Sequence, residues 1–321
     1  MENDKILITG GAGYIGSILC RKLLDKGHYI RIMDIFNFGF DSLREIMPNK
    51  DLELFPGDIR KPEDVTKALE DIDAIIHLAA IVGDPACAVQ ADVAVETNYL
   101  STLRLAMAAK EKKIKKFLFA STCSVYGAGD EILYEDSELN PQSLYAETKI
   151  FAEKGITDLS NEEFNPVILR LGTLYGLSPR PRFDLVINSL TGKIMTENKC
   201  LIFGGEQWRP FLHVEDVARA FVLAFENYDN MKGNIYNVGE NKGNYQMKDI
   251  GKIFEEVFPE ADIQYVQEIK DPRSYNVNFD KIEKVGFKLS KEIKPTVEEI
   301  RDFIKDNSID FKASQYYNYH P

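Results

Sequence analysis

A short apolar run that leads directly into evenly spaced glycines is the feature that most constrains this chain. Residues Lys5–Gly16 read KILITGGAGYIG, a β-type segment followed by the spacing Gly-x-x-Gly-x-x-Gly, and a helical pattern begins at once. One glycine makes the tight turn, one lets the backbone approach a phosphate, and one lets the helix lie close to the strand. The start of that helix offers N–H donors and a partial positive charge. The pattern predicts a loop that binds a dinucleotide pyrophosphate through Gly10, Gly13, Tyr14, Ile15 and Gly16.

An acidic residue at the end of the second expected strand narrows the ligand to NAD. Tyr29–Asp34 reads as a strand, and Asp34 lies at the distance from the glycines expected of a ribose-binding carboxylate. A carboxylate there accepts hydrogen bonds from the ribose 2′-hydroxyl and repels a 2′-phosphate. Arg31 lies nearby, but inside the strand rather than at its end. The alternative is an ordinary Gly-rich turn, and the strand, the helix and the acid together argue against it.

Composition excludes several classes of protein. The 321 residues are 44% hydrophobic and 28% charged, as in ordinary globular proteins, and the net charge is −12. An acidic chain lacks the electrostatic footprint of a nucleic-acid or anionic-membrane partner, so we expect neither. We find no apolar run of transmembrane length and no signal peptide. The scattered cysteines lack metal-ligand spacing, which predicts reduced thiols, no metal site and a cytoplasmic location: Cys20, Cys87, Cys123 and Cys200.

Strands and helices alternate through the first half of the chain. Apolar strands are expected at 5–9, 29–34, 52–55, 74–79, 116–120 and 165–170, and helices at 62–69, 92–113 and 144–159. Continuous apolar strands between helices are typical of a parallel sheet covered on both faces, the α/β doubly wound class. After residue 176 the pattern is mixed, although a helix at 213–227 and a strand at 234–238 could rejoin the sheet. Ligands bind beyond the carboxyl ends of such strands.

A tyrosine and a lysine follow one of these strand ends. Thr122 lies two residues after the strand that ends at Ala120, and Tyr145 and Lys149 lie four residues apart, on one face of the next helix. The ammonium group is expected to lower the pKa of the tyrosine towards working pH and to hold the nicotinamide ribose. Tyr145 would then remove a proton from a substrate hydroxyl that Thr122 orients. A surface Tyr–Lys pair is the alternative, and the glycine motif makes the catalytic interpretation the stronger one.

Further motifs occur in the order found in one enzyme family. The segments are Asp34-Ile35-Phe36-Asn37, Gly57-Asp58-Ile59-Arg60, Leu78-Ala79-Ala80, Asn98 and Arg170-Leu171-Gly172-Thr173-Leu174-Tyr175-Gly176. With them the chain resembles an extended short-chain dehydrogenase/reductase of the NAD-dependent nucleotide-sugar epimerase/dehydratase family. The resemblance implies a Rossmann-type sheet with a smaller mixed α/β substrate domain. It also implies cofactor contacts from Asn37, Asp58, Ile59, Leu78, Ala79, Ala80 and Asn98, besides Tyr145 and Lys149.

The second half resembles the part of this family that holds the sugar nucleotide. Arg209, within Trp208–Asp216, and Arg273, within Asp271-Pro272-Arg273, would contact the diphosphate, for which planar guanidinium groups are suited. Surface ion pairs are the alternative for either arginine. Thr173 stands where the family has an asparagine that contacts substrate. Asp84 could bind sugar hydroxyls or simply form a turn before Pro85. The expected domains are 1–175 with 210–240 for NAD, and 176–209 with 241–321 for the sugar nucleotide.

One departure from the family concerns the reaction. The 4,6-dehydratases carry Asp-Glu before Val-Tyr-Gly, whereas this chain has Cys123-Ser124, a poor acid–base pair for expelling water. The sequence therefore favours oxidation of a nucleotide sugar at C4 without dehydration, by a 4-epimerase or a 4-dehydrogenase. A reductase of a keto-sugar nucleotide and a non-catalytic dinucleotide-sensing regulator are the alternatives. The resemblance also implies surface polysaccharide biosynthesis and a homodimer that pairs through helices 92–113 and 144–159.

Overall fold

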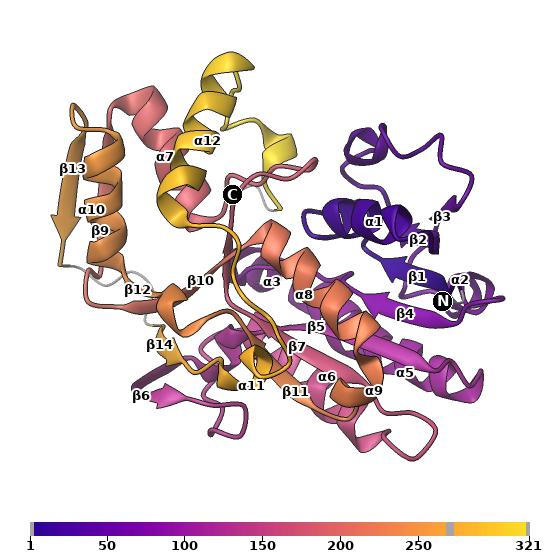
Figure 1. Ribbon diagram of the computed structural model, residues 1–321. Coiled ribbons are helices and arrows are strands. Elements are labelled where there is room, and N and C mark those ends of the chain that lie inside the picture. Colours follow the sequence, from indigo (N-terminus) through magenta and orange to yellow (C-terminus); the bar gives the residue numbers. More distant parts are fainter. Residues whose placement is uncertain (1–2, 268–272, 319–321) are drawn as a thin grey trace.

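A seven-stranded parallel sheet forms the centre of the molecule (Figure 1). The computed structural model describes residues 3–267 and 273–318. The strands are β1 (Lys5–Thr9), β2 (Tyr29–Asp34), β3 (Leu52–Pro56), β4 (Ala74–His77), β5 (Lys116–Thr122), β7 (Val167–Leu171) and β11 (Ile235–Val238). Their order is β11-β7-β5-β4-β1-β2-β3, and every neighbouring pair is parallel. The order reverses between β1 and β4, and a ligand crevice is expected at this point.

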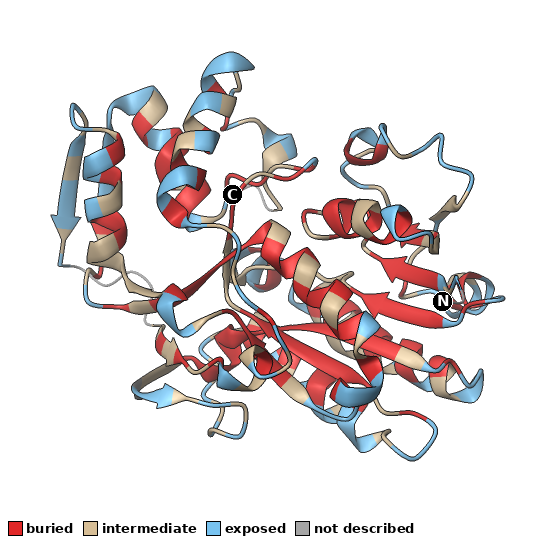
Figure 2. Cartoon of the chain, viewed as in Figure 1, coloured by how far each residue is buried: buried red, intermediate tan, exposed pale blue. Residues whose placement is uncertain are grey.

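Helices cover both faces of the sheet, because its strands are apolar on both sides. On one face lie α1 (Gly16–Asp25) and α8 (Val214–Glu226); on the other lie α2 (Pro62–Ala68), α5 (Ser101–Glu111) and α6 (Leu144–Asp158). Figure 2 shows the central strands buried and the outward sides of several helices exposed. This is the Rossmann-type α/β architecture that the alternating pattern predicts, and the prediction is confirmed.

Smaller sheets and a separate apolar cluster form the rest of the molecule. β8 (Thr173–Tyr175), β10 (Trp208–His213) and β12 (Asn244–Gln246) make one sheet; β9 (Lys199–Phe203) pairs with β13 (Asp262–Val266), and β6 (Ala128–Leu133) pairs with β14 (Ser274–Val277). The helices α7 (Val186–Glu197), α10 (Met247–Val257) and α12 (Ile293–Asp306) contribute to an apolar cluster centred on Phe183, Phe254 and Phe311.

The remaining elements are short. They are α3 (Asp84–Val89), α4 (Ala91–Val95), α9 (Tyr228–Met231), α11 (Asp280–Glu283), a π-helical turn η2 (Glu96–Leu100) and the 3-10 turns η1 (Asp41–Leu43), η3 (Cys123–Tyr126), η4 (Asn241–Gly243) and η5 (Ser314–Tyr316). The helix expected at 92–113 is thus interrupted by a π-helical turn. The segment after β4 forms α3, which begins at Asp84, where the sequence allowed a turn. β11 pairs with β7, so the strand expected at 234–238 does rejoin the sheet.

The C-terminal third contributes to both parts of the core. Tyr275, Phe279 and Phe287 are buried in the same cluster as β1 and α8, although they follow residue 241 in the chain. The expected division into two domains therefore remains a prediction. Among the described residues, no helix has both the length and the apolarity needed to cross a membrane.

Candidate active site

The backbone packs so closely in the turn between β1 and α1 that a side chain at its glycine positions would clash. Gly10 has φ +73°, and a Cβ there would lie 2.8 Å from the Ala79 nitrogen. A Cβ on Gly16 would collide with the carbonyl oxygen of Gly10, and one on Gly13 would approach that oxygen to 3.1 Å. Ile15 begins the helix without a side-chain cap, and the first turn holds no acidic residue. These features fit the pyrophosphate of a dinucleotide at a helix N-terminus.

Asp34 lies at the end of β2 and contacts the glycine loop. One carboxylate oxygen accepts the Ala12 N–H (3.1 Å) and the other accepts the Phe36 N–H (2.9 Å). Burial raises the pKa of Asp34, whereas these backbone hydrogen bonds lower it. Asn37 is exposed just beyond the strand. The carboxylate is therefore held beside the loop, where a ribose would bring its hydroxyl groups.

The end of β3 leads to Asp58 and Ile59, which are expected to contact the cofactor. The carboxylate of Asp58 pairs with Arg60 at 2.6 Å, and this partner lowers the pKa of Asp58. The Asp58 N–H donates to Asp64 (3.0 Å). Ile59 is buried in the cluster on the α2 side of the sheet. The carboxylate is thus bonded within its own turn, to Arg60.

The strand end after β4 is joined to helix α6 by one buried asparagine. Leu78 and Ala79 follow β4, with their N–H groups directed at the carbonyl and hydroxyl of Thr9 (3.1 and 3.3 Å). Just beyond Ala80, the Asn98 amide accepts the Ile81 N–H and donates to the Ile81 carbonyl, both at 2.8 Å. Asn98 lies in η2, and π-helical turns occur often at functional sites.

The three expected catalytic residues come together at the end of β5. Thr122 lies at the strand end, and Tyr145 and Lys149 project from successive turns of α6. The Tyr145 hydroxyl shares a side-chain hydrogen bond with Thr122. Lys149 is 3% exposed, and its Nζ donates to the Ala120 carbonyl at 2.9 Å. The four-residue spacing and the strand end thus produce the arrangement expected from sequence.

The pKa of Tyr145 differs from expectation. Burial raises it, and the groups that oppose this rise are Arg182 and the Thr122 hydrogen bond. Burial also lowers the pKa of Lys149 to about 8, with Cys87 and Glu153 acting in the opposite direction. Sequence reasoning expected the lysine to lower the tyrosine pKa, but the loss of solvation outweighs such an effect for a phenol in this environment.

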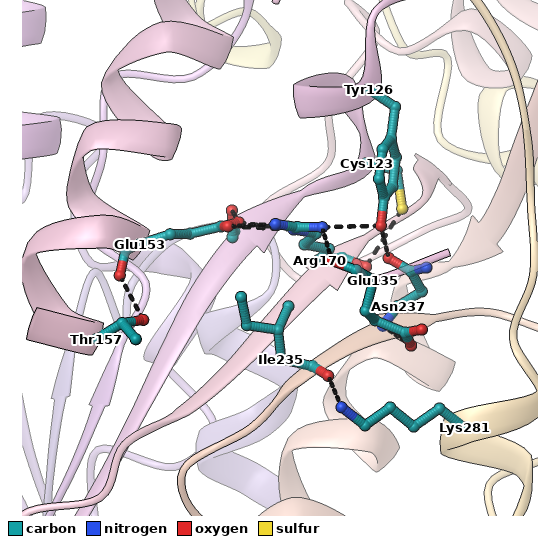
Figure 3. A network of polar contacts seen from close by, with 10 residues as sticks. Cys123, Tyr126, Glu135, Glu153, Thr157, Arg170, Ile235, Asn237 and Lys281 are labelled. Atoms are coloured by element: carbon teal, nitrogen blue, oxygen red, sulfur yellow. Dashed lines mark hydrogen bonds and ion pairs between the residues drawn. The ribbon is translucent and has the colours of Figure 1, made fainter. Parts of the chain in front are cut away.

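A buried ion pair anchors α6 beneath these residues, and sequence reasoning did not identify it. Glu153 and Arg170 are separated by 2.7 Å, with side chains only 4% and 3% exposed. Figure 3 shows the guanidinium of Arg170 between Glu153 and Tyr126, with Asn237 beyond. Ser121, next to Thr122, also donates to Glu153. The signal in the sequence was the position of Glu153, four residues after Lys149 on the same helix face.

Three of the residues expected to bind substrate contact one another: Asp84 and Arg209 each interact with Arg273. Asp84 and Arg273 form an ion pair at 2.9 Å, and one oxygen of Asp84 is buried without a hydrogen-bond partner among the described residues. Arg209 donates to the carbonyl of Arg273 and lies 5.3 Å from the ring centroid of Tyr275. Thr173 lies opposite Phe211 in the β8–β10 pairing. Residues 271 and 272 of the Asp-Pro-Arg motif lie outside the described residues.

Two cysteines lie close to this site, in different surroundings. Cys123 is fully buried, and its Sγ donates to the Arg170 carbonyl at 3.4 Å, which is a packing position. Cys87 on α3 interacts electrostatically with both Tyr145 and Lys149, and burial raises its pKa to about 11. No signal in the sequence placed Cys87 there. Among the residues that the structure describes, no group of three acidic, histidine or cysteine side chains could hold a metal ion.

Comparison with known proteins agrees with this geometry. The model of the NAD dependent epimerase/dehydratase family matches residues 6–239. The UDP-glucose 4-epimerase of Bacillus subtilis (strain 168) is 30% identical over 282 residues, which cover 78% of this chain and 81% of that protein. The dTDP-D-glucose 4,6-dehydratase of Dictyostelium discoideum is 30% identical over 256 residues, 74% of this chain and 58% of that protein.

A solved structure shares the whole fold. The crystal structure of UDP-glucuronic acid 4-epimerase from Bacillus cereus, in complex with UDP-glucuronic acid and NAD, matches with a TM-score of 0.82 and 29% identity. The match covers 94% of this chain and 99% of that one. With the glycine cradle, Asp34 and the Thr–Tyr–Lys group, these likenesses show that the chain belongs to the NAD dependent epimerase/dehydratase family and is an NAD-dependent enzyme of the nucleotide-sugar epimerase/dehydratase type.

Proposed function

We propose that this enzyme oxidises the C4 hydroxyl of a nucleotide-diphosphate sugar without removing water. The observation that carries the proposal is the joint position of Thr122, Tyr145 and Lys149 at the end of β5, with Cys123-Ser124 next to them. Tyr145 takes the hydroxyl proton as general base, Thr122 orients that hydroxyl, and Lys149 supplies a cation and a donor. NAD, when bound, supplies the hydride acceptor. Neither a buried thiol nor a serine hydroxyl replaces the paired carboxyl groups that an elimination needs.

We propose that the substrate diphosphate is held by Arg209 and Arg273, with Asp84 and Thr173 facing the sugar. The Asp84–Arg273 ion pair supports this, because a diphosphate competes with a carboxylate for the same planar guanidinium. UDP-sugars are the first substrates to test, since the similar epimerases from both Bacillus species are named for them. The division into an NAD-binding part and a sugar-nucleotide-binding part belongs to the same proposal.

We further propose a cytoplasmic site of action, in which the product feeds surface polysaccharide synthesis. The location is supported by the four cysteines, which are free and buried in the structure. Free thiols are typical of a reducing compartment.

Mass spectrometry of the product tests the reaction. The enzyme is incubated with NAD and each of the UDP-, dTDP-, GDP- and CDP-sugars, and Tyr145→Phe serves as the inactive control. An unchanged mass with a new isomer identifies a 4-epimerase, and loss of two hydrogens identifies a 4-dehydrogenase. Loss of water would contradict the proposal. Turnover only of keto-sugar nucleotides with NADH would favour the reductase, and binding without any turnover would favour a regulator.

A further inference from the structure

A loop from the second part of the molecule is fixed onto the cofactor loop. The Tyr14 hydroxyl donates to the Gly176 carbonyl at 2.8 Å, and the hydroxyl oxygens of Ser17 and Ser178 are 3.4 Å apart. Ser178 also closes a turn with Arg180, accepting its N–H (3.1 Å) and donating to its carbonyl (3.0 Å). The loop that follows β8 therefore contacts the start of α1.

Arg180 at the end of this turn joins three distant segments. Its guanidinium carbon lies 3.8 Å from the ring centroid of Phe38, in the segment after β2. One terminal nitrogen donates to the Tyr317 carbonyl at 3.3 Å, in the C-terminal tail. Arg180 is only 6% exposed, and its Nε is buried without a hydrogen-bond partner among the described residues. A buried donor without a partner is costly, which indicates that a bound ligand supplies the acceptor.

The charges around Arg180 indicate what that ligand is. Arg180 is repelled by Arg182 and attracted to the carboxylates of Asp184 and Asp34, and it also interacts with Tyr14. Tyr14 belongs to the pyrophosphate loop and Asp34 to the ribose site, so the guanidinium lies between the two parts of the cofactor site. Burial lowers its pKa to about 10, and the group still carries a positive charge at neutral pH. A buried cation with an unused N–H is suited to an anionic oxygen.

We propose that Arg180 binds the adenosine diphosphate half of NAD and, with Phe38 and Tyr317, forms a strap that slows NAD release. Arg180 is then a cofactor-binding residue, and it belongs to no motif that identifies the cofactor site from sequence. The strap explains why the loop after β8 and the C-terminal tail meet the segment after β2. The inference depends on NAD as cofactor and is independent of which sugar is oxidised.

The release rate of NADH tests the strap directly. Enzyme loaded with NADH is mixed with excess NAD, and the loss of bound NADH fluorescence is followed by stopped flow. We expect Arg180→Ala and Phe38→Ala each to release NADH about tenfold faster than wild type. Arg44→Ala and Phe40→Ala are matched controls from the same segment after β2. Arg44 is exposed and pairs with Asp41, and the Phe40 ring contacts Phe36 in a tilted arrangement. Both should release NADH at the wild-type rate.

A purely structural role gives a different result. If Arg180 only braced the loop, Arg180→Ala would lower the melting temperature while the release rate stayed at the wild-type value, and the proposal would be overturned. Should Arg180→Ala fail to fold, Phe38→Ala decides the question, because that ring is 47% exposed and its removal leaves the core intact. An unchanged release rate in Phe38→Ala would then overturn the strap. Equal acceleration in the control variants would also contradict it.

Discussion

Neighbouring groups shift the pKa of the Tyr145 hydroxyl in opposite directions. Burial holds its pKa high, while Thr122 and Arg182 lower it. The proposed role of Tyr145 as general base requires that these neighbours hold its hydroxyl accurately. The ion pair between Glu153 and Arg170 helps to hold Tyr145 in place, because it joins α6 to β7.

The first prediction concerns this hydroxyl. Tyr145→Phe removes the proton acceptor and leaves the ring in place, so kcat should fall about 10²–10⁴-fold without loss of stability. Tyr134→Phe is the matched control, because Tyr134 is 46% exposed and is expected to have no role. Steady-state kinetics and thermal unfolding measure both effects. A near wild-type kcat for Tyr145→Phe would refute the catalytic assignment.

Asp34 gives the second prediction. Wild type should bind NAD at least about tenfold more tightly than NADP, because the carboxylate repels a 2′-phosphate. Asp34→Asn removes the charge and keeps one of the two oxygens that accept the Ala12 and Phe36 N–H groups, so the preference should shrink. Calorimetric titration of both proteins with both cofactors measures it. Equal or tighter binding of NADP by wild type would contradict the role of Asp34.

At the scale of elements, the sequence predicts those features that depend on a single strand, turn or helix. The glycines after β1 must be glycines, and Tyr145 and Lys149 share a face because a helix repeats every 3.6 residues. Residues whose role depends on contacts between distant segments were missed. Arg180 meets Phe38 and Tyr317, and neither has a periodic relation to it. Asp84 and Pro85 begin helix α3, because an Asp-Pro pair can begin a helix as well as form the turn that the sequence suggested.

The helices α5 and α6 carry the third prediction, a homodimer. Met107 and Phe151 on these helices are 53% and 52% exposed, and the rings of Tyr99 and Phe151 are tilted, with centroids 5.6 Å apart. Large apolar side chains on one surface favour association with a second copy. Light scattering at micromolar concentration should give a dimer for wild type and a monomer for Phe151→Glu. Leu201→Glu on β9, 36% exposed, is the control that should stay dimeric. A monomeric wild type would exclude the dimer.

At the scale of the whole molecule, burial of the charged Lys149 lowers the stability of the folded protein. Lys149 is almost fully buried, and its pKa falls from 10.5 to about 8. A lowered lysine pKa means that the unfolded chain binds more protons than the folded one between pH 8 and 10.5. The cost is therefore complete below pH 8 and disappears as the pH rises through that interval. The proposed role of Lys149 thus requires a buried cation that folding alone would disfavour.

This cost gives the fourth prediction. Lys149→Met should lose activity and yet raise the free energy of unfolding at pH 7 by roughly 1–3 kcal/mol, because no buried cation remains. The gain over wild type should shrink between pH 8 and 10.5. Urea unfolding at several pH values measures it, with Lys154→Met, whose side chain is 72% exposed, as the control. A gain that is absent, or that does not change with pH, would contradict the prediction.

The placement of β11 and of Phe279 and Phe287 has a consequence for biosynthesis. During translation, β7 is an unpaired sheet edge until β11 has been made, and the α8 face of the sheet lacks part of its covering until Phe287 emerges. Large chains expose apolar surface while they wait for such late segments, and chaperones protect them. Nearly the whole polypeptide must therefore leave the ribosome before the core around β1 is complete.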